Sequence, residues 1–129
     1  MNVQAIAKGV KISPRKVGIV ASLVRNQSVE NALIILDHTP RRSAEPVKKV
    51  IASAKANAEH NHNLKPDTLE IVEIIVTPGP RLKRFKPAAR GRALPFQKRS
   101  SHIRVVVTGE ERVAKKPAAK VTTAKKEAK

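Results

Sequence analysis

Apolar residues at helical spacing mark three stretches in the first half of the chain. The first stretch follows Ser13 and Pro14, which are typical of an N-cap and a first helical residue, and its apolar positions are Val17, Val20, Ala21 and Val24. The second stripe is Val29, Ala32, Leu33 and Leu36, and the third and longest is Val47, Val50, Ile51, Ala54 and Ala58. We predict three helices, the third beginning at Thr39 and Pro40 and bending at Pro46.

Two later stretches have the composition of strands. Residues 69–77, LEIVEIIVT, and residues 103–109, IRVVVTG, are rich in β-branched side chains and too short for confident helices, and residues 3–12 form a weaker third candidate. Antiparallel pairing of 69–77 with 102–109 makes everything between them one very long hairpin. Helices and strands together predict an α+β fold.

The segment that joins these two strands, residues 79–100, has eight Lys or Arg residues and no acid. It must either coil on the surface or project as a ribbon, which would reach on the order of 35 Å at about 3.3 Å per residue. A projecting ribbon has no core beneath it and its charges repel, so a partner must supply its order. Pro80, Pro87 and Pro95 discourage pairing with another edge, and Gly91 permits a positive φ near the tip.

The net charge points to a polyanionic partner. The chain of 129 residues has 27 basic and 10 acidic side chains, a net charge of +17, which favours nucleic acid first and an anionic membrane surface second. Its length fits one domain, which we place at 1–109. Residues 110–129 have few large apolar side chains and are predicted to be a disordered basic tail.

Several kinds of chemistry have no support in the sequence. The chain contains no cysteine, which excludes disulfides and thiolate metal sites and is compatible with the cytoplasm. His60 and His62 are not spaced as a helical zinc pair, so we expect no metal and no cofactor. Glu70 and Glu73 lie three apart on a predicted strand and should face opposite sides of it, which is poor geometry for an acid and base pair. We expect no enzyme activity and, because no long apolar stretch exists, no membrane span.

Three motifs carry a resemblance to a known family: KISPRKV at the first helix, SAKANAEHNHNL at the end of the third, and GP-LKRF-P-ARGRA----KRSSHI across the basic segment. With these motifs the chain, from about Val3 to Thr108, resembles the bacterial-type large-subunit ribosomal protein of universal family twenty-two. The resemblance implies three helices packed on a small antiparallel sheet, with a long protruding β-hairpin arm. It also implies a structural role in the large subunit, with the arm reaching through large-subunit rRNA and its tip lining the nascent-peptide exit tunnel.

The resemblance and the charge pattern together indicate the site residues. The expected rRNA-binding residues are Ser13, Arg15, Lys16, Arg81, Lys83, Arg84, Lys86, Arg90, Arg92, Lys98, Arg99 and His102. The expected tunnel-lining tip is Ala88, Ala89, Arg90, Gly91 and Arg92. Expected partners are large-subunit rRNA, neighbouring large-subunit proteins and the nascent polypeptide, in a cytoplasmic ribosome, with no membrane partner and no homo-oligomer.

Two other functions fit parts of the sequence. An architectural DNA-binding protein with a minor-groove ribbon arm would share the basic arm and its prolines, but would normally be a dimer, and no spare apolar face is obvious. A membrane-active polybasic protein needs a basic amphipathic helix with large apolar anchors, whereas this basic segment is interrupted by proline. Phe85 and Phe96, the only aromatic residues, could stack on bases or pack against each other's strands in the hairpin.

Overall fold

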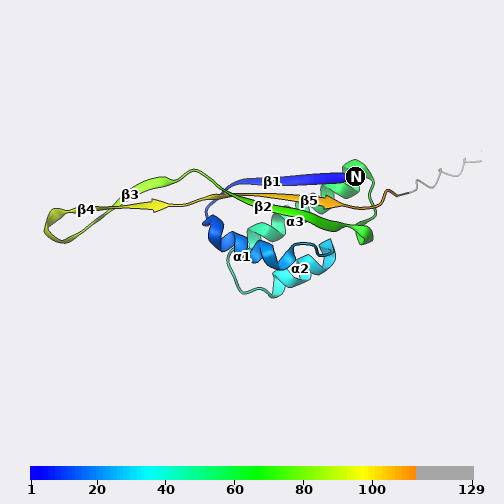
Figure 1. Cartoon of the computed structure of the whole chain (residues 1–129), viewed down its shortest axis with the longest axis horizontal. Coiled ribbons are helices and arrows are strands. Elements are labelled where there is room, and N and C mark those ends of the chain that lie inside the picture. Colours follow the sequence, from blue (N-terminus) through cyan, green and yellow to red (C-terminus); the bar gives the residue numbers. More distant parts are fainter. Residues whose placement is uncertain (113–129) are drawn as a thin grey trace, which may run out of the picture.

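Three helices and five strands make up the described part of the chain, residues 1–112 of a computed structural model (Figure 1). They are β1 (Asn2–Val10), α1 (Pro14–Val24), α2 (Val29–His38), α3 (Ala44–His62), β2 (Glu70–Pro78), β3 (Leu82–Pro87), β4 (Ala93–Lys98) and β5 (Ser101–Thr108). Short 3-10 turns occur at Pro66–Thr68 and Ala89–Gly91. The α+β prediction is confirmed.

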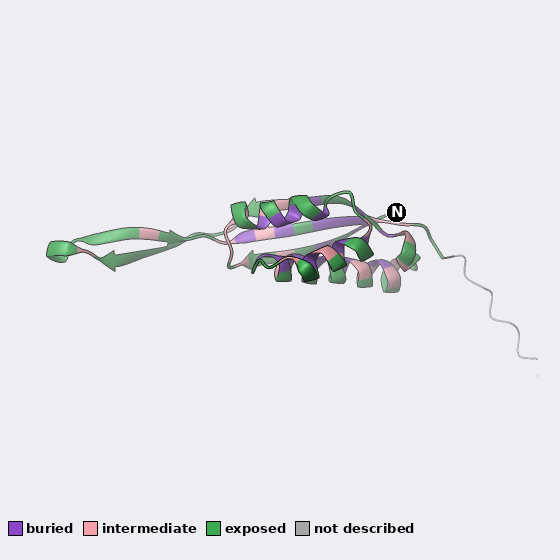
Figure 2. Cartoon of the chain, turned by 90° about the horizontal axis from the view of Figure 1, so that it is seen from below, coloured by how far each residue is buried: buried purple, intermediate pink, exposed green. Residues whose placement is uncertain are grey.

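The body of the protein is a three-stranded antiparallel sheet with helices on one face. The strand order is β1-β5-β2, so the last strand lies in the centre, and Val105 pairs with Ala5 on one side and Ile74 on the other. The predicted pairing of 69–77 with 102–109 is therefore confirmed. Side chains that face the helices are buried, while those of the opposite face, such as Arg104, are largely exposed. Figure 2 shows buried and exposed residues alternating along the sheet. That alternation follows the period of two along a strand.

The helices bury the predicted stripes except for Leu33, which is half-buried, but the start of the third helix was predicted wrongly. Thr39 ends α2 instead, since its N–H donates to the carbonyl of Leu36 at 3.3 Å. Helix α3 begins five residues later at Ala44, and Pro46 is its third residue. A proline in the first turn removes no helical hydrogen bond, because the N–H groups of that turn have no partner within the helix. The physical reason for a bend at Pro46 is therefore absent.

A β-bulge in β2 overturns the expectation for its two acids. Glu70 pairs with Thr108, yet Glu73 pairs with Val106, so three steps along β2 match two along β5 and Val72 is the extra residue. Glu70 and Glu73 therefore lie on the same face of the sheet rather than on opposite faces. Both are exposed on the side away from the helices.

The core belongs entirely to the body. Its largest fully buried side chains are Ile51, Leu64, Leu69, Ile71, Ile74 and Ile103. The body also includes the first three residues of the predicted tail, because Lys65 N–H donates to the carbonyl of Glu110 at 2.9 Å and Arg112 N–H to that of Asn63 at 2.8 Å. The remainder of that predicted tail, residues 113–129, lies outside the described residues. None of the helices within residues 1–112 is long and apolar enough to cross a bilayer.

Candidate nucleic-acid interface

The basic segment forms a projecting ribbon, which decides between the two alternatives for this segment. Strands β3 and β4 pair antiparallel, from Leu82 with Lys98 to Pro87 with Ala93, and make a two-stranded sheet of their own. The ribbon extends away from the body along the long axis of the molecule (Figure 1). Between residues 81 and 99 only Ala88 and Phe96 are half-buried and none is buried, so the arm has no core of its own. Figure 2 shows the arm almost entirely in the colour of exposed residues.

The register of the arm divides its side chains into two unlike faces. Directly paired residues of antiparallel strands share a face. We call one face the cationic face; it consists of Leu82, Lys98, Arg84, Phe96, Lys86 and Leu94. The other, the apolar face, consists of Lys83, Gln97, Phe85, Pro95, Pro87 and Ala93. Three of the four cations of the paired strands therefore lie on one side of the ribbon.

The two phenylalanines differ because they lie on different faces. Phe96 is half-buried, and the Lys86 ammonium lies 5.3 Å from the centre of its ring, a cation–π distance. Phe85 is on the apolar face and is 75% exposed. Phe96 therefore packs within the hairpin, whereas the ring of Phe85 is available to a partner.

The tip turns through two residues with positive φ. Gly91 has φ of +69°, as its position predicted, and Arg90 has φ of +60°, which the sequence did not indicate. The Ala88 N–H closes the turn by donating to the carbonyl of Arg92 at 2.7 Å. Both tip arginines are exposed.

The arm joins the body at a narrow, closely packed base. Gly79 N–H donates to the carbonyl of Ser100 at 2.9 Å, and the Ser100 hydroxyl donates to the carbonyl of Pro80 at 2.6 Å. A Cβ at Gly79 would lie 2.6 Å from Ser100 Oγ, so only glycine fits this position without a shift. Arg15, Arg81 and Arg99 line a cavity here, which unites one predicted residue of the first helix with two of the arm.

The remaining predicted residues lie near this base. Ser13 precedes α1 without making a side-chain cap, and the carbonyl of Lys16 accepts a hydrogen bond from the Ser43 hydroxyl at 3.3 Å. His102 Nδ1 accepts from the N–H of Gly9 at 2.9 Å, which holds the bulge of β1 against β5. That contact assigns the ring proton to Nε2, the nitrogen that can donate to a phosphate. The sequence predicted His102 as a binding residue but gave no sign of its contact with β1.

The arm's cations have no acidic partners within the described chain. The four ion pairs of residues 1–112 join Lys48 to Asp37, Lys49 to Glu45, Lys55 to Glu30 and Lys65 to Glu110, and all lie on the body. The hydrogen bond and positive charge of Lys49 lower the pKa of Glu45 below its usual value. Unpaired cations on an exposed ribbon remain available to an external polyanion.

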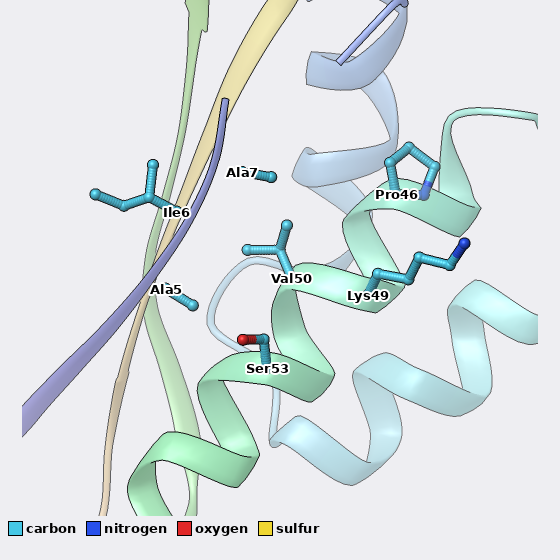
Figure 3. Close-up of a pocket in the computed structure, with 7 residues that line it drawn as sticks. All are labelled: Ala5, Ile6, Ala7, Pro46, Lys49, Val50 and Ser53. Carbon is cyan, nitrogen blue, oxygen red and sulfur yellow. The ribbon is translucent and has the colours of Figure 1, made fainter. Parts of the chain in front are cut away.

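A second hollow of the body is unsuited to an anion. It lies between β1 and α3, has a volume of about 260 Å³ and is lined by Ala5, Ile6, Ala7, Pro46, Lys49, Val50 and Ser53. Figure 3 shows Ala5 and Ala7 directed toward α3 and Ile6 directed to the other side of β1. Its one cation, Lys49, is paired with Glu45 at 2.7 Å. No group of three or more His, Cys, Asp or Glu side chains in the described chain is placed to hold a metal.

Comparison with known proteins identifies the family of this basic-armed chain. The family model described as "Ribosomal protein L22p/L17e" matches residues 5–108, which include the body and the whole arm. The chain belongs to the L22p/L17e family. This confirms the resemblance found in the motifs, and the absence of enzyme activity follows because L22p/L17e proteins are structural ribosomal proteins.

Relatives in this family are similar over most of their lengths. The chain is 50% identical over 107 residues to "Large ribosomal subunit protein uL22" of Clostridioides difficile strain 630, covering 83% of this chain and 96% of the relative. It is 55% identical over 104 residues to the protein of that name from Desulfitobacterium hafniense strain DCB-2, covering 81% and 91%. The Oceanobacillus iheyensis protein of that name is 51% identical over 108 residues, covering 84% and 96%. The L22p/L17e likeness therefore includes the arm.

Proposed function

We propose that this chain is a structural constituent of the large ribosomal subunit that binds large-subunit rRNA with its arm and arm base. The observation that carries the proposal is the arm itself. It is an exposed ribbon within residues 79–100, which contain eight cations and no acid. None of these eight cations is in an ion pair of the described chain. Family membership supports it, and assigns the chain to the ribosome of the cytoplasm.

The mechanism is charge neutralisation combined with shape. The cationic face contributes Arg84, Lys86 and Lys98 to phosphates, and guanidinium groups can also reach 2′-hydroxyls or stack on bases. Because a two-stranded ribbon without a core is marginal in water, rRNA on its surface supplies the order that the arm lacks alone. A ribbon held by rRNA on both sides bridges rRNA segments that are separated in sequence.

The tip has a separate role in the proposal. Residues 88–92 line the narrow part of the nascent-peptide exit tunnel, where Ala88 and Ala89 present small side chains and Arg90 and Arg92 present charge to rRNA and to the nascent polypeptide. The body contacts rRNA through Ser13, Arg15 and Lys16 and touches neighbouring large-subunit proteins. No second copy of the chain is needed, since one ribbon is complete within one chain.

Competition binding tests this function. The full chain is titrated against large-subunit rRNA, with small-subunit rRNA and duplex DNA of equal phosphate content as competitors at one salt concentration. We expect large-subunit rRNA to be preferred over both competitors and the affinity to fall steeply with salt. Equal affinity for duplex DNA would instead support the architectural DNA-binding alternative, which shares the basic ribbon.

A further inference from the structure

Three separate parts of the chain line an open cavity at the base of the arm. Pro14 and Arg15 come from the start of α1, and Pro78 is the last residue of β2. Gly79 and Arg81 come from the link between β2 and β3, and Arg99 and Ser100 from the link between β4 and β5. The volume is about 280 Å³. One water requires only about 10–15 Å³ of such volume, so a phosphate group fits with room for solvent.

The charges around this cavity favour one kind of ligand. Three arginines, Arg15, Arg81 and Arg99, are among its seven lining residues, with no acid. No arginine of residues 1–112 is in an ion pair, so none of these three guanidinium groups has a carboxylate partner within the described chain. The planar fork of donors on arginine matches the oxygens of a phosphate. The first turn of α1 contains no acid, so the positive end of the α1 helix dipole adds to the positive potential of the three arginines.

The position of the cavity gives a bound anion a mechanical effect. Strands β3 and β4 pair only with each other, so the direction of the arm depends on its two links to the body. The links are held to each other by the Gly79 N–H bond to the Ser100 carbonyl. Arg15 belongs to the body, whereas Arg81 and Arg99 belong to the links. An anion held by all three ties the links to α1.

We propose that this cavity binds a single backbone phosphate of RNA and thereby fixes the direction of the arm relative to the body. The inference rests on the proposed rRNA binding and adds to it one shared phosphate, contacted from α1 and from both links. The inference also implies an order of assembly: the body docks on that phosphate first, and the direction of the arm becomes fixed afterwards.

A double-mutant cycle in the full chain tests the shared phosphate. Arg15→Gln, Arg99→Gln and the double variant are compared for large-subunit rRNA affinity over a range of salt. If both arginines hold one phosphate, their effects on affinity are not additive. The double variant then lowers the slope of log affinity against log salt concentration by about 0.7 to 0.9, the amount expected for one lost phosphate contact. Additive effects with twice that loss of slope would mean separate phosphates and overturn the inference while leaving rRNA binding intact. A wild-type chain that does not bind rRNA overturns the proposed function and this inference with it.

A distance measurement tests the effect on the arm. The chain has no cysteine, so spin labels attach only to cysteines introduced at Ala89→Cys in the tip and Ala56→Cys in α3. Double electron–electron resonance then measures the distance between the tip and α3. We expect rRNA to narrow the distribution of label-to-label distances in the wild-type background, and to narrow it less in the Arg15→Gln/Arg99→Gln background. The control variant Arg41→Gln/Arg104→Gln loses the same charge outside the cavity, and rRNA should narrow its distance distribution as much as that of the wild type. Equal narrowing in all three backgrounds contradicts the inference, and full narrowing with inorganic phosphate alone would overturn RNA as the source of the anion.

Unchanged thermal unfolding of each variant confirms that the comparison concerns binding. Arg15, Arg81 and Arg99 are all exposed, so their neutral variants should unfold at the same midpoint as the wild type. Arg99→Lys is the conservative variant: it keeps the charge and removes the fork. It should retain the salt slope but recover only part of the affinity, whereas full recovery would show that the fork geometry is not used.

Discussion

Neutralising the cationic face of the arm should change how rRNA affinity depends on salt. The perturbation is the triple variant Arg84→Gln/Lys86→Gln/Lys98→Gln. It removes three charges from one side of the ribbon and changes no residue of the core. Each lost phosphate contact lowers the slope of log affinity against log salt by about 0.7 to 0.9. Three contacts therefore lower it by about 2 to 3 units, which makes the affinity loss between 50 and 200 mM salt about 20- to 40-fold smaller than that of the wild type.

The assay is filter binding or fluorescence titration of large-subunit rRNA at four or more salt concentrations. The matched control Arg84→Lys/Lys86→Arg/Lys98→Arg keeps every charge on the cationic face, and it should keep the wild-type slope. Lys83→Gln removes one charge from the apolar face and reports whether that face also meets phosphate. A triple variant with the wild-type slope would refute phosphate contact by the cationic face.

Three further changes test the body and its independence from the arm. Deleting residues 83–97 removes no core residue, so cooperative thermal unfolding should persist near the midpoint of the full chain; loss of cooperativity would show that the body needs its arm. Ile51→Ala at a fully buried position should cost about 2–5 kcal/mol in urea unfolding, and a loss below about 0.5 kcal/mol would contradict its place in the core. The pKa of the Glu45 carboxyl, measured by NMR, should lie below its usual value and return toward that value in Lys49→Ala. The small stabilisation from this pair is present above the pKa of the unfolded state and disappears as the pH falls through the pKa of the folded state. A Glu45 pKa that is not lowered would contradict the pair.

The periodic elements of the body could be predicted because local pattern and burial agree there. The stripe that begins at Val17 is fully buried in α1, and the β-branched run at 103–109 became the central strand β5. The start of α3 could not be predicted in the same way, because Thr39 and Pro40 have the residue types of a helix start, yet the helix begins at Ala44. Ser43, which precedes it, makes no side-chain cap and donates its hydroxyl to the carbonyl of Lys16 instead, a long-range contact that local sequence does not indicate.

Long-range pairing limits what the sequence can say about the interface. Eight cations without an acid were sufficient to predict a basic arm, but the division into a cationic and an apolar face depends on register, which the residues alone do not determine. The bulge at Val72 likewise reversed the relation between two acids. The approach of Arg15 to Arg81 and Arg99 arises from the fold, because more than sixty positions separate Arg15 from Arg81.

The measurement that tests the account most directly is photo-crosslinking from a reactive amino acid placed at Ala89, within the tip, in living cells. Ala89 is exposed, so the substitution should leave the fold intact. Sequencing the captured nucleic acid and identifying the captured peptide report what surrounds the tip. The account predicts large-subunit rRNA together with nascent polypeptides. Capture of genomic DNA, or of no nucleic acid, would contradict it.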